Sequence, residues 1–317
     1  MSGPELLTIG RVSVDLYAEQ LGVPLAAVQS FAKSVGGSPT NVAVAAARLG
    51  SRSAVVTAVG DDAFGAYVRE ALGGFGVDTR FVGSHPTLRT PLAFAAMDPP
   101  EDPTLLFYRE PSAPDEEIEL EERHLEAARD AAIFWVAGSC LSGRLTGPTT
   151  RAMLEARARK THTVLDLDYR PTFWPSEADA RRDIGAAVDH ATAAVGNRRE
   201  CEVAVGTGDP DAAADALLAR GLELAIVKLG ADGVLVATAE GRTRVEPFPV
   251  QVVCGLGAGD AFGGALCHAL LRGATPVEAV RAANAAGAIV ASRLLCADAM
   301  PTAEEVDELL DAEGAAA

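Results

Sequence analysis

The chain has 317 residues, of which 49% are hydrophobic and 22% are charged, enough apolar content for a sizeable α/β core. Its formal charge of -17 opposes binding to nucleic acid and to anionic membranes, so we exclude both as partners. No secretory signal, no apolar run near the ~18 residues of a membrane span and no CxxC pair is present, which predicts a cytoplasmic protein without a zinc site or disulfide framework.

The first third of the chain shows the least regular pattern. It predicts a helix over Pro39–Leu49, a strand over Ser53–Val59 and a helix over Ala63–Leu72. Two β-like runs follow, Thr90–Met97 and Thr104–Tyr108, separated by a proline-rich turn. A hairpin that interrupts an α/β pattern is a candidate lid over a site, although an ordinary edge hairpin has the same pattern.

From about residue 130 onward, strands and helices alternate. The predicted elements are strand Ala131–Val136, helix Thr149–Lys160, strand Thr163–Leu167, helix Glu177–His190, strand Ala191–Val195, helix Asp211–Arg220 and strand Leu224–Leu229. This alternation predicts an α/β fold with a doubly wound, mostly parallel sheet. An antiparallel hairpin over Gly233–Ala237 and Thr243–Phe248 comes next, then one helix starting near Asp260 and another opening with the capping box Thr275-Pro-Val-Glu278.

The strongest chemical motif is Gly255-Leu-Gly-Ala-Gly-Asp260, which leads into a helix. Gly257 and Gly259 permit a tight turn, and free amides at the positive end of a helix form an anion site. Asp260 has two interpretations of similar weight: a helix cap, or a carboxylate that accepts the proton of an incoming hydroxyl beside a bound phosphate. The Walker A and GxGxxG patterns are absent from this segment.

Three other segments have polar or glycine-rich patterns. Gly36 and Gly37 would allow a small molecule to approach, and Asn41 offers both donor and acceptor, although a simple turn explains them as well. Asn197-Arg-Arg-Glu200 follows a predicted strand and could organise hydrated Mg²⁺, although a solvated helix start is the commoner meaning. The turn from Lys228 to Gly233 could admit a nucleotide.

Together, Gly-Gly-x-x-x-Asn, Asn-x-x-Glu and Gly-Ala-Gly-Asp, in this order and at these separations, resemble the ribokinase-like (PfkB) carbohydrate kinases over essentially the whole chain. The resemblance implies one domain over residues 1–317 with a small β lid drawn from about 11–35 and 88–110, and ATP and Mg²⁺ as cofactors. It implies Asp260 as the catalytic base, an anion hole at Gly257, Ala258 and Gly259, Mg²⁺ ordered by Asn197 and Glu200 through water, a nucleotide pocket with Lys228, Gly230, Gly233 and Asn284, and a sugar site with Asp15, Gly36, Gly37 and Asn41.

The segments Phe107-Tyr-Arg-Glu-Pro and Asp166-Leu-Asp-Tyr-Arg170 resemble those of the family's sugar-acid kinases, including the kinase of bacterial inositol breakdown. By this resemblance Arg109 and Arg170 would pair with a substrate carboxylate, and Tyr108 would add a hydrogen bond. The implied reaction phosphorylates the terminal hydroxyl of a small sugar acid. The alternatives are a kinase for 2-keto-3-deoxygluconate or another sugar, and a non-catalytic ligand-binding protein on the same fold.

Two properties stay open at this point. Ribokinase carries an aspartate before Gly-Ala-Gly-Asp that helps bind an activating monovalent cation, whereas this chain has Cys254, and a thiol is a poor ligand for a hard cation. Dependence on a monovalent cation is therefore undecided. Lid hairpins of the family often pair between subunits, so the resemblance allows a homodimer.

Overall fold

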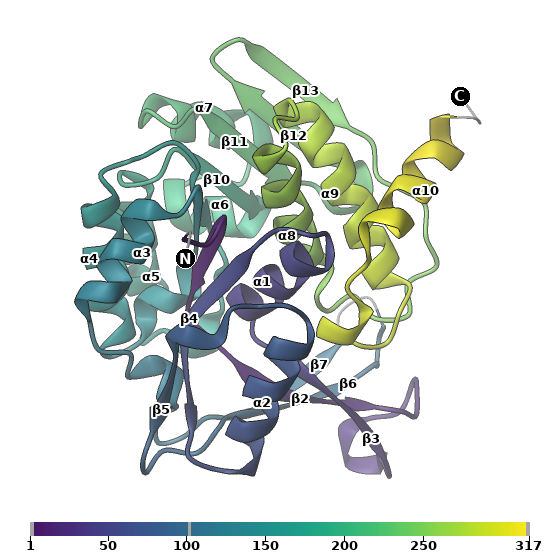
Figure 1. Cartoon of the computed structure of the whole chain (residues 1–317). Helices are drawn as coiled ribbons and strands as arrows, with labels where there is room; N and C mark the ends of the chain where they lie inside the picture. Colours follow the sequence, from purple (N-terminus) through teal and green to yellow (C-terminus); the bar gives the residue numbers. More distant parts are fainter. Residues whose placement is uncertain (1–2, 101–102, 315–317) are drawn as a thin grey trace.

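The computed structural model describes residues 3–100 and 103–314, which form two β-sheets and their covering helices (Figure 1). The main sheet has nine strands in the order β13-β12-β11-β10-β9-β8-β1-β4-β5. Their bounds are β1 Leu6–Ile9, β4 Ser53–Gly60, β5 Val82–His85, β8 Ile133–Ala137, β9 Thr163–Asp166, β10 Ala193–Asn197, β11 Leu224–Lys228, β12 Val234–Thr238 and β13 Gly241–Val245. Strands from β5 to β11 in this order are parallel, and β12 and β13 are antiparallel additions.

Helices cover both faces of the main sheet. One face packs against α1 (Ser38–Arg48), α2 (Ala63–Gly74), α8 (Ala258–Leu271), α9 (Pro276–Ala291) and α10 (Ala303–Gly314). The other packs against α3 (Glu122–Asp130), α4 (Thr146–Arg157), α5 (Glu177–Val188), α6 (Arg198–Val205) and α7 (Pro210–Ala219). Burial on both faces explains why the inner strands are continuous apolar runs. The predicted doubly wound α/β class is therefore confirmed.

A second sheet lies at one end of the main sheet, at the lower right of Figure 1. Its order is β3-β2-β6-β7, with β2 Ser13–Ala18, β3 Phe31–Gly36, β6 Leu92–Ala96 and β7 Thr104–Tyr108. β2 pairs antiparallel with β3 and parallel with β6, so two stretches far apart in sequence form one surface. Alternation along the strands gives this sheet an inner face toward the main domain and an outer face away from it.

Several predicted boundaries differ from the observed ones. The helix expected over Thr149–Lys160 runs over Thr146–Arg157, because Pro148 is tolerated in a first turn and the chain becomes left-handed at Ala158 (φ 52°). The strand expected over Thr243–Phe248 runs over Gly241–Val245. Part of the proline-rich turn between β6 and β7, residues 101–102, lies outside the described residues.

The sheet order reverses beside β1, because the chain continues from β1 to β4 on one side and returns to β8 on the other. In doubly wound sheets ligands bind outside the carboxyl ends of the strands at such a point. The loops that follow β1, β8 and β9 lie next to one another at this point of the sheet. Among the described residues, no helix combines the length and apolarity required to cross a membrane.

Candidate active site

A cavity of about 240 Å³ lies between the inner face of the second sheet and the N-terminal ends of α1 and α8. Its wall includes Arg11, Ser13, Asp15, Tyr17, Gly37, Ser38, Asn41, Phe107, Arg170, Gly257, Gly259, Asp260 and Cys296. We call it the polar cavity. Of the expected sugar-site and base residues, it brings together Asp15, Gly37, Asn41, Arg170 and Asp260.

Asp260 lies in the first turn of α8, and the helix cap is Gly257 rather than Asp260. Gly257 has φ 80°, and a Cβ there would lie 2.5 Å from Sγ of Cys296, so the turn requires glycine. Burial raises the pKa of Asp260 more than its hydrogen bonds from Asn41 and Ser38 lower it. Asp260 is therefore a stronger base than a free aspartate, beside the positive end of a helix.

Asn41 orients this carboxylate. Its Nδ2 donates to Oδ2 of Asp260 at 2.9 Å, while its buried Oδ1 has no hydrogen-bond partner among the described residues. Such an unpaired buried acceptor costs about 1–3 kcal/mol, so it favours a ligand that donates a hydrogen bond there. Asn41 is only 2% exposed and lines the polar cavity, which fits a sugar hydroxyl.

Asp15 reaches the polar cavity from β2, accepting hydrogen bonds from Ser13 Oγ (2.6 Å) and the Tyr17 hydroxyl (3.3 Å). Burial raises the pKa of Asp15 to about 6. Gly36 on the neighbouring strand makes room for it, because a Cβ there would lie 2.0 Å from the Asp15 carboxyl group. Gly37 (φ 99°) is similarly confined by a backbone oxygen 2.3 Å from its would-be Cβ. Packing therefore requires glycine at both positions, and the role of Gly36 is to leave room for the Asp15 side chain.

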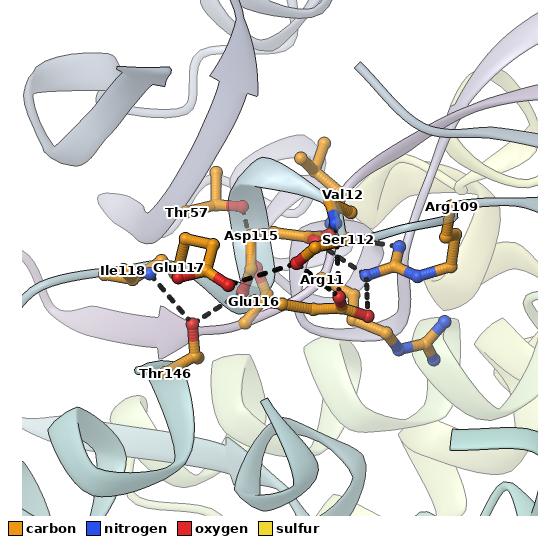
Figure 2. A network of polar contacts seen from close by, with 12 residues as sticks. Arg11, Val12, Thr57, Arg109, Ser112, Asp115, Glu116, Glu117, Ile118 and Thr146 are labelled. Carbon is orange, nitrogen blue, oxygen red and sulfur yellow. Dashed lines mark hydrogen bonds and ion pairs between the residues drawn. The ribbon is translucent and has the colours of Figure 1, made fainter. Parts of the chain in front are cut away.

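The two arginines expected to bind a carboxylate lie in different surroundings. Arg170 lines the polar cavity, with Nε 3.0 Å from Oδ1 of Asp168. Arg109 does not line it: its guanidinium turns toward Asp115 and Glu116 (Figure 2), at 2.6 and 3.1 Å.

Tyr108 also lies away from the polar cavity. β7 alternates, so Phe107 faces inward and Tyr108 faces outward. Tyr108 is 60% exposed and packs edge-on against Phe94, with ring centres 5.4 Å apart. The structure thus keeps the Tyr108 and Arg109 side chains apart from the other expected sugar-site residues.

Sequence reasoning missed a polar cluster next to the point where the sheet order reverses. Arg11 follows β1, Ser139 follows β8 and Asp168 follows β9, so three adjacent parallel strands deliver them to one edge. Nη2 of Arg11 lies 3.6 Å from Oδ2 of Asp168, which also accepts a hydrogen bond from Ser139. Burial acts to raise the pKa of Asp168, but Arg170 and Arg11 together lower it below its usual range. The available signal was Arg11, two residues after the short apolar run of β1.

A second cavity, of about 770 Å³, lies on the other side of the α8 N-terminus, and we call it the apolar cavity. It is lined by the expected nucleotide residues Lys228, Gly230, Gly233 and Asn284, with Ala258 and Gly259 of the anion-hole segment and with apolar residues Val234, Phe248, Val250, Val252 and Phe262. Gly259 lines both cavities, so they meet at the first turn of α8.

Lys228 stands at this junction. Its Nζ is 3.7 Å from the position that a Cβ of residue 259 would take and 3.9 Å from Oε2 of Glu200. Burial acts to lower the pKa of Lys228, but four nearby carboxylates outweigh that effect and raise it: Glu200 first, then Asp166, Asp168 and Asp260. Lys228 therefore carries its positive charge at neutral pH. It lies beside the first turn of α8, where a phosphate would bind.

Asn197 and Glu200 form the capping box of α6, and neither side chain lines either cavity. Asn197 Oδ1 accepts from the Glu200 amide (2.9 Å), and Glu200 Oε2 accepts from the Asn197 amide (2.7 Å). Within residues 3–100 and 103–314, no three His, Cys, Asp or Glu side chains converge as a metal site. Cys254, at the position of the ribokinase aspartate, is fully buried among Tyr17, Met97 and Cys296.

The fold and these two cavities are typical of a small-molecule kinase: a polar cavity that contains a buried carboxylate meets a larger, mostly apolar cavity at a helix N-terminus. Residues 4–303 match the family model described as pfkB family carbohydrate kinase. The chain belongs to this family and is an ATP-dependent sugar kinase.

Named relatives agree with the family assignment. The 5-dehydro-2-deoxygluconokinase of Photobacterium profundum is 34% identical over 317 residues, covering 97% of this chain and 95% of the relative. The protein of the same name from Geobacillus thermodenitrificans is 30% identical over 313 residues, covering 96% and 93%. A solved E. coli structure described as a ribokinase II, in complex with ATP and Mg²⁺, has a TM-score of 0.88 at 23% identity, covering 98% of this chain and all of that one. The ribokinase-like fold and the resemblance to the family are therefore confirmed.

Proposed function

We propose that the chain transfers the γ-phosphoryl group of ATP to the terminal hydroxyl of 2-deoxy-5-keto-gluconate, as its relatives named 5-dehydro-2-deoxygluconokinase would. One observation favours a sugar acid over a neutral sugar as the acceptor. Arg170 places a positive charge on the wall of the polar cavity, in a chain whose net charge is -17. An acidic protein has no general attraction for an anion, so a placed arginine supplies it locally.

In the proposed reaction, side chains of the polar cavity bind and deprotonate the acceptor. Asp15 and Oδ1 of Asn41 accept hydrogen bonds from sugar hydroxyls. Asp260 takes the proton of the attacking hydroxyl as the new phosphorus–oxygen bond forms, held in place by Asn41. The amides of Gly257, Ala258 and Gly259 at the α8 N-terminus stabilise the negative charge on the moving phosphoryl group.

The apolar cavity is the proposed nucleotide site. Its apolar wall suits an adenine ring, Gly230 and Asn284 line it, and Lys228 lies where the phosphates would reach the junction. Gly233 is needed for the turn, because a Cβ there would lie 2.2 Å from the carbonyl oxygen of Val245. Mg²⁺ neutralises charge on the phosphates when bound, and we propose that Asn197 and Glu200 act on it through water, since their oxygens already serve the α6 cap.

We further propose that the second sheet is the lid of a single kinase domain spanning residues 1–317. Its inner residues Asp15 and Phe107 already form part of the polar cavity. Its outer face exposes Leu106 (44%) and Tyr108 (60%) beside Phe94, an apolar surface suited to pairing with the same face of a second copy.

A coupled assay of ADP release tests the function. With Mg-ATP, the panel is 2-deoxy-5-keto-gluconate, 2-keto-3-deoxygluconate, fructose and ribose. We expect kcat/KM for the first to exceed the others at least about tenfold, the effect of roughly 1.4 kcal/mol of differential binding. Preference for 2-keto-3-deoxygluconate would reassign the substrate and keep the mechanism. Absence of turnover with retained ATP binding would favour a non-catalytic binding protein.

A further inference from the structure

Two guanidinium groups on the wall of the polar cavity share one carboxylate. Nε of Arg170 lies 3.0 Å from Oδ1 of Asp168, and Nη2 of Arg11 lies 3.6 Å from Oδ2 of the same side chain. Asp168 is buried, and both arginines line the cavity. These three side chains carry two positive charges and one negative charge, an excess of one positive charge, and Glu200, Asp260 and Asp166 also attract Arg170.

The balance of charge around Arg109 is the opposite one, with more negative than positive groups. Its single guanidinium faces two carboxylates, Asp115 and Glu116 (Figure 2), and the residue is 9% exposed. Asp115 also accepts a hydrogen bond of 2.7 Å from the amide of Val12, which joins β1 to the second sheet. Arg109 therefore ties the exit of β7 to the entrance of β2, and two carboxylates face its single positive charge, while its buried Nε has no hydrogen-bond partner among the described residues.

The Arg11 side chain is held in position without a ligand. Its guanidinium carbon lies 4.7 Å from the ring centre of Phe173, its Nε donates to Ser139 Oγ at 3.4 Å, and its side chain is 12% exposed. Its backbone oxygen accepts from Thr40 Oγ1 at 2.8 Å, which fixes it to the start of α1. A preorganised arginine loses little conformational entropy on binding. Arg170, with 49% of its side chain exposed, is the more exposed partner of the pair.

We infer that Arg11 and Arg170, braced by Asp168, are the pair that binds the carboxylate of the acceptor, and that Arg109 instead positions the second sheet. The inference rests on the proposed function in taking the acceptor to be a sugar acid. A bound carboxylate brings the cluster to two positive and two negative charges, with forked hydrogen bonds. The same wall orients the acceptor, because its carboxylate is drawn to the arginines and repelled by Asp260, so a hydroxyl is left to face the base.

Calorimetric binding of D-gluconate and D-glucitol tests the pair directly, because these probes differ only in the carboxylate at carbon 1. We expect the unmodified protein to bind gluconate at least about tenfold more tightly, because only gluconate can form charge-assisted hydrogen bonds to the two arginines through its carboxylate. Arg11→Met and Arg170→Met should each abolish most of that preference, and Arg11→Lys should restore part of it. Arg109→Lys, with its charge retained at the Asp115 pair, should leave the preference intact.

Kinetics separates the inference from the proposed function. In Arg11→Met, KM for the sugar-acid substrate should rise about 10- to 100-fold while KM for ATP stays unchanged. A gluconate preference without turnover of 2-deoxy-5-keto-gluconate would reject the proposed substrate and uphold the pair. If the unmodified protein showed no preference for gluconate over glucitol, the assignment of the two arginines would be overturned. The same would follow if folded Arg11→Met and Arg170→Met kept the full preference. Thermal unfolding of each variant establishes that it is folded.

Discussion

Asn41 and Asp260 are joined by a hydrogen bond of 2.9 Å between Nδ2 and Oδ2, which connects the first turn of α1 to the first turn of α8. With its nitrogen turned toward Asp260, the amide has its buried oxygen left without a partner on the wall of the polar cavity. One side chain thereby orients the proposed base and offers an acceptor to the sugar. This coupling leads to our first prediction.

Asp260→Asn should lower kcat by at least about 100-fold, because an amide cannot take the hydroxyl proton in the reaction. ATP binding should persist, since the apolar cavity is unchanged. ADP release and nucleotide titration measure the two effects. Asn41→Ala is the matched control: it should raise KM for the acceptor and lower kcat less than Asp260→Asn does. A variant Asp260→Asn with a tenth of the normal rate would contradict the base assignment.

The raised pKa of Asp15, about 6, predicts a pH effect on binding. Below pH 6 the carboxyl group is protonated and accepts hydrogen bonds less well, so KM for the acceptor should rise as pH falls through 6. Asp15→Asn should raise KM at pH 8 and remove this dependence. Steady-state kinetics between pH 5 and 8 measures it. A KM that stays constant over this range in the unmodified protein would exclude Asp15 as the titrating group.

Asp15 should also reduce stability at neutral pH. Its folded pKa exceeds the ordinary value of 3.8, so the folded state binds the proton more tightly. Its contribution to stability is fully present below pH 3.8 and is lost as pH rises through about 6. Asp15→Asn should therefore raise the free energy of unfolding at pH 8, on the order of 1–3 kcal/mol, with a smaller gain near pH 5. Urea unfolding at both pH values measures this, and a gain that is larger at pH 5 would refute the explanation.

Lys228 should act on the phosphoryl group rather than on the sugar. Lys228→Met should lower kcat about 10- to 100-fold, while KM for the acceptor changes little, because Nζ lies at the junction beside Gly259. Lys228→Arg, which keeps the charge, is the control and should retain more activity. If Lys228→Met changed only the acceptor KM, Lys228 would belong to the sugar site instead.

Most of the main sheet could be predicted, because strands such as β8 and β11 are short apolar runs bounded by polar turns. The second sheet is harder, since β2 and β6 are adjacent in space yet about 80 residues apart in sequence, and local patterns do not report such pairing. The early glycine pair and the late Asp260 motif were visible as local signals. Whether those residues act as proposed depends on the experiments above.

The arginines show where sequence reasoning reaches its limit. Arg109 and Arg170 both stand next to a tyrosine and near acidic residues, so their segments look equivalent. Their surroundings differ because Asp115 folds back onto Arg109, whereas Arg170 shares Asp168 with Arg11 from a distant strand end. Only tertiary contacts separate a positioning arginine from one that remains available to a ligand.

The outer face of the second sheet predicts an oligomer. If two copies pair through this face, Leu106→Asp should convert a dimer into a monomer, because a charge on an apolar interface core must be desolvated. Light scattering after size-exclusion chromatography gives the mass of each form. Glu240→Gln, on the exposed β12–β13 turn, is the control and should not change the mass. A monomeric unmodified protein at micromolar concentration would argue against this interface.

Gly259 is the residue at which the two cavities meet; its backbone has no positive φ, and its would-be Cβ has an ordinary contact of 3.7 Å with Nζ of Lys228. A valine at this position could be accommodated by the helix, yet its methyl groups would stand between the two ligands. The Gly259→Val variant would bind ATP and the acceptor together and keep the acceptor hydroxyl from reaching the phosphoryl group. It offers a way to capture the complete, unreacted assembly for crystallography, which a rapidly turning-over enzyme does not allow.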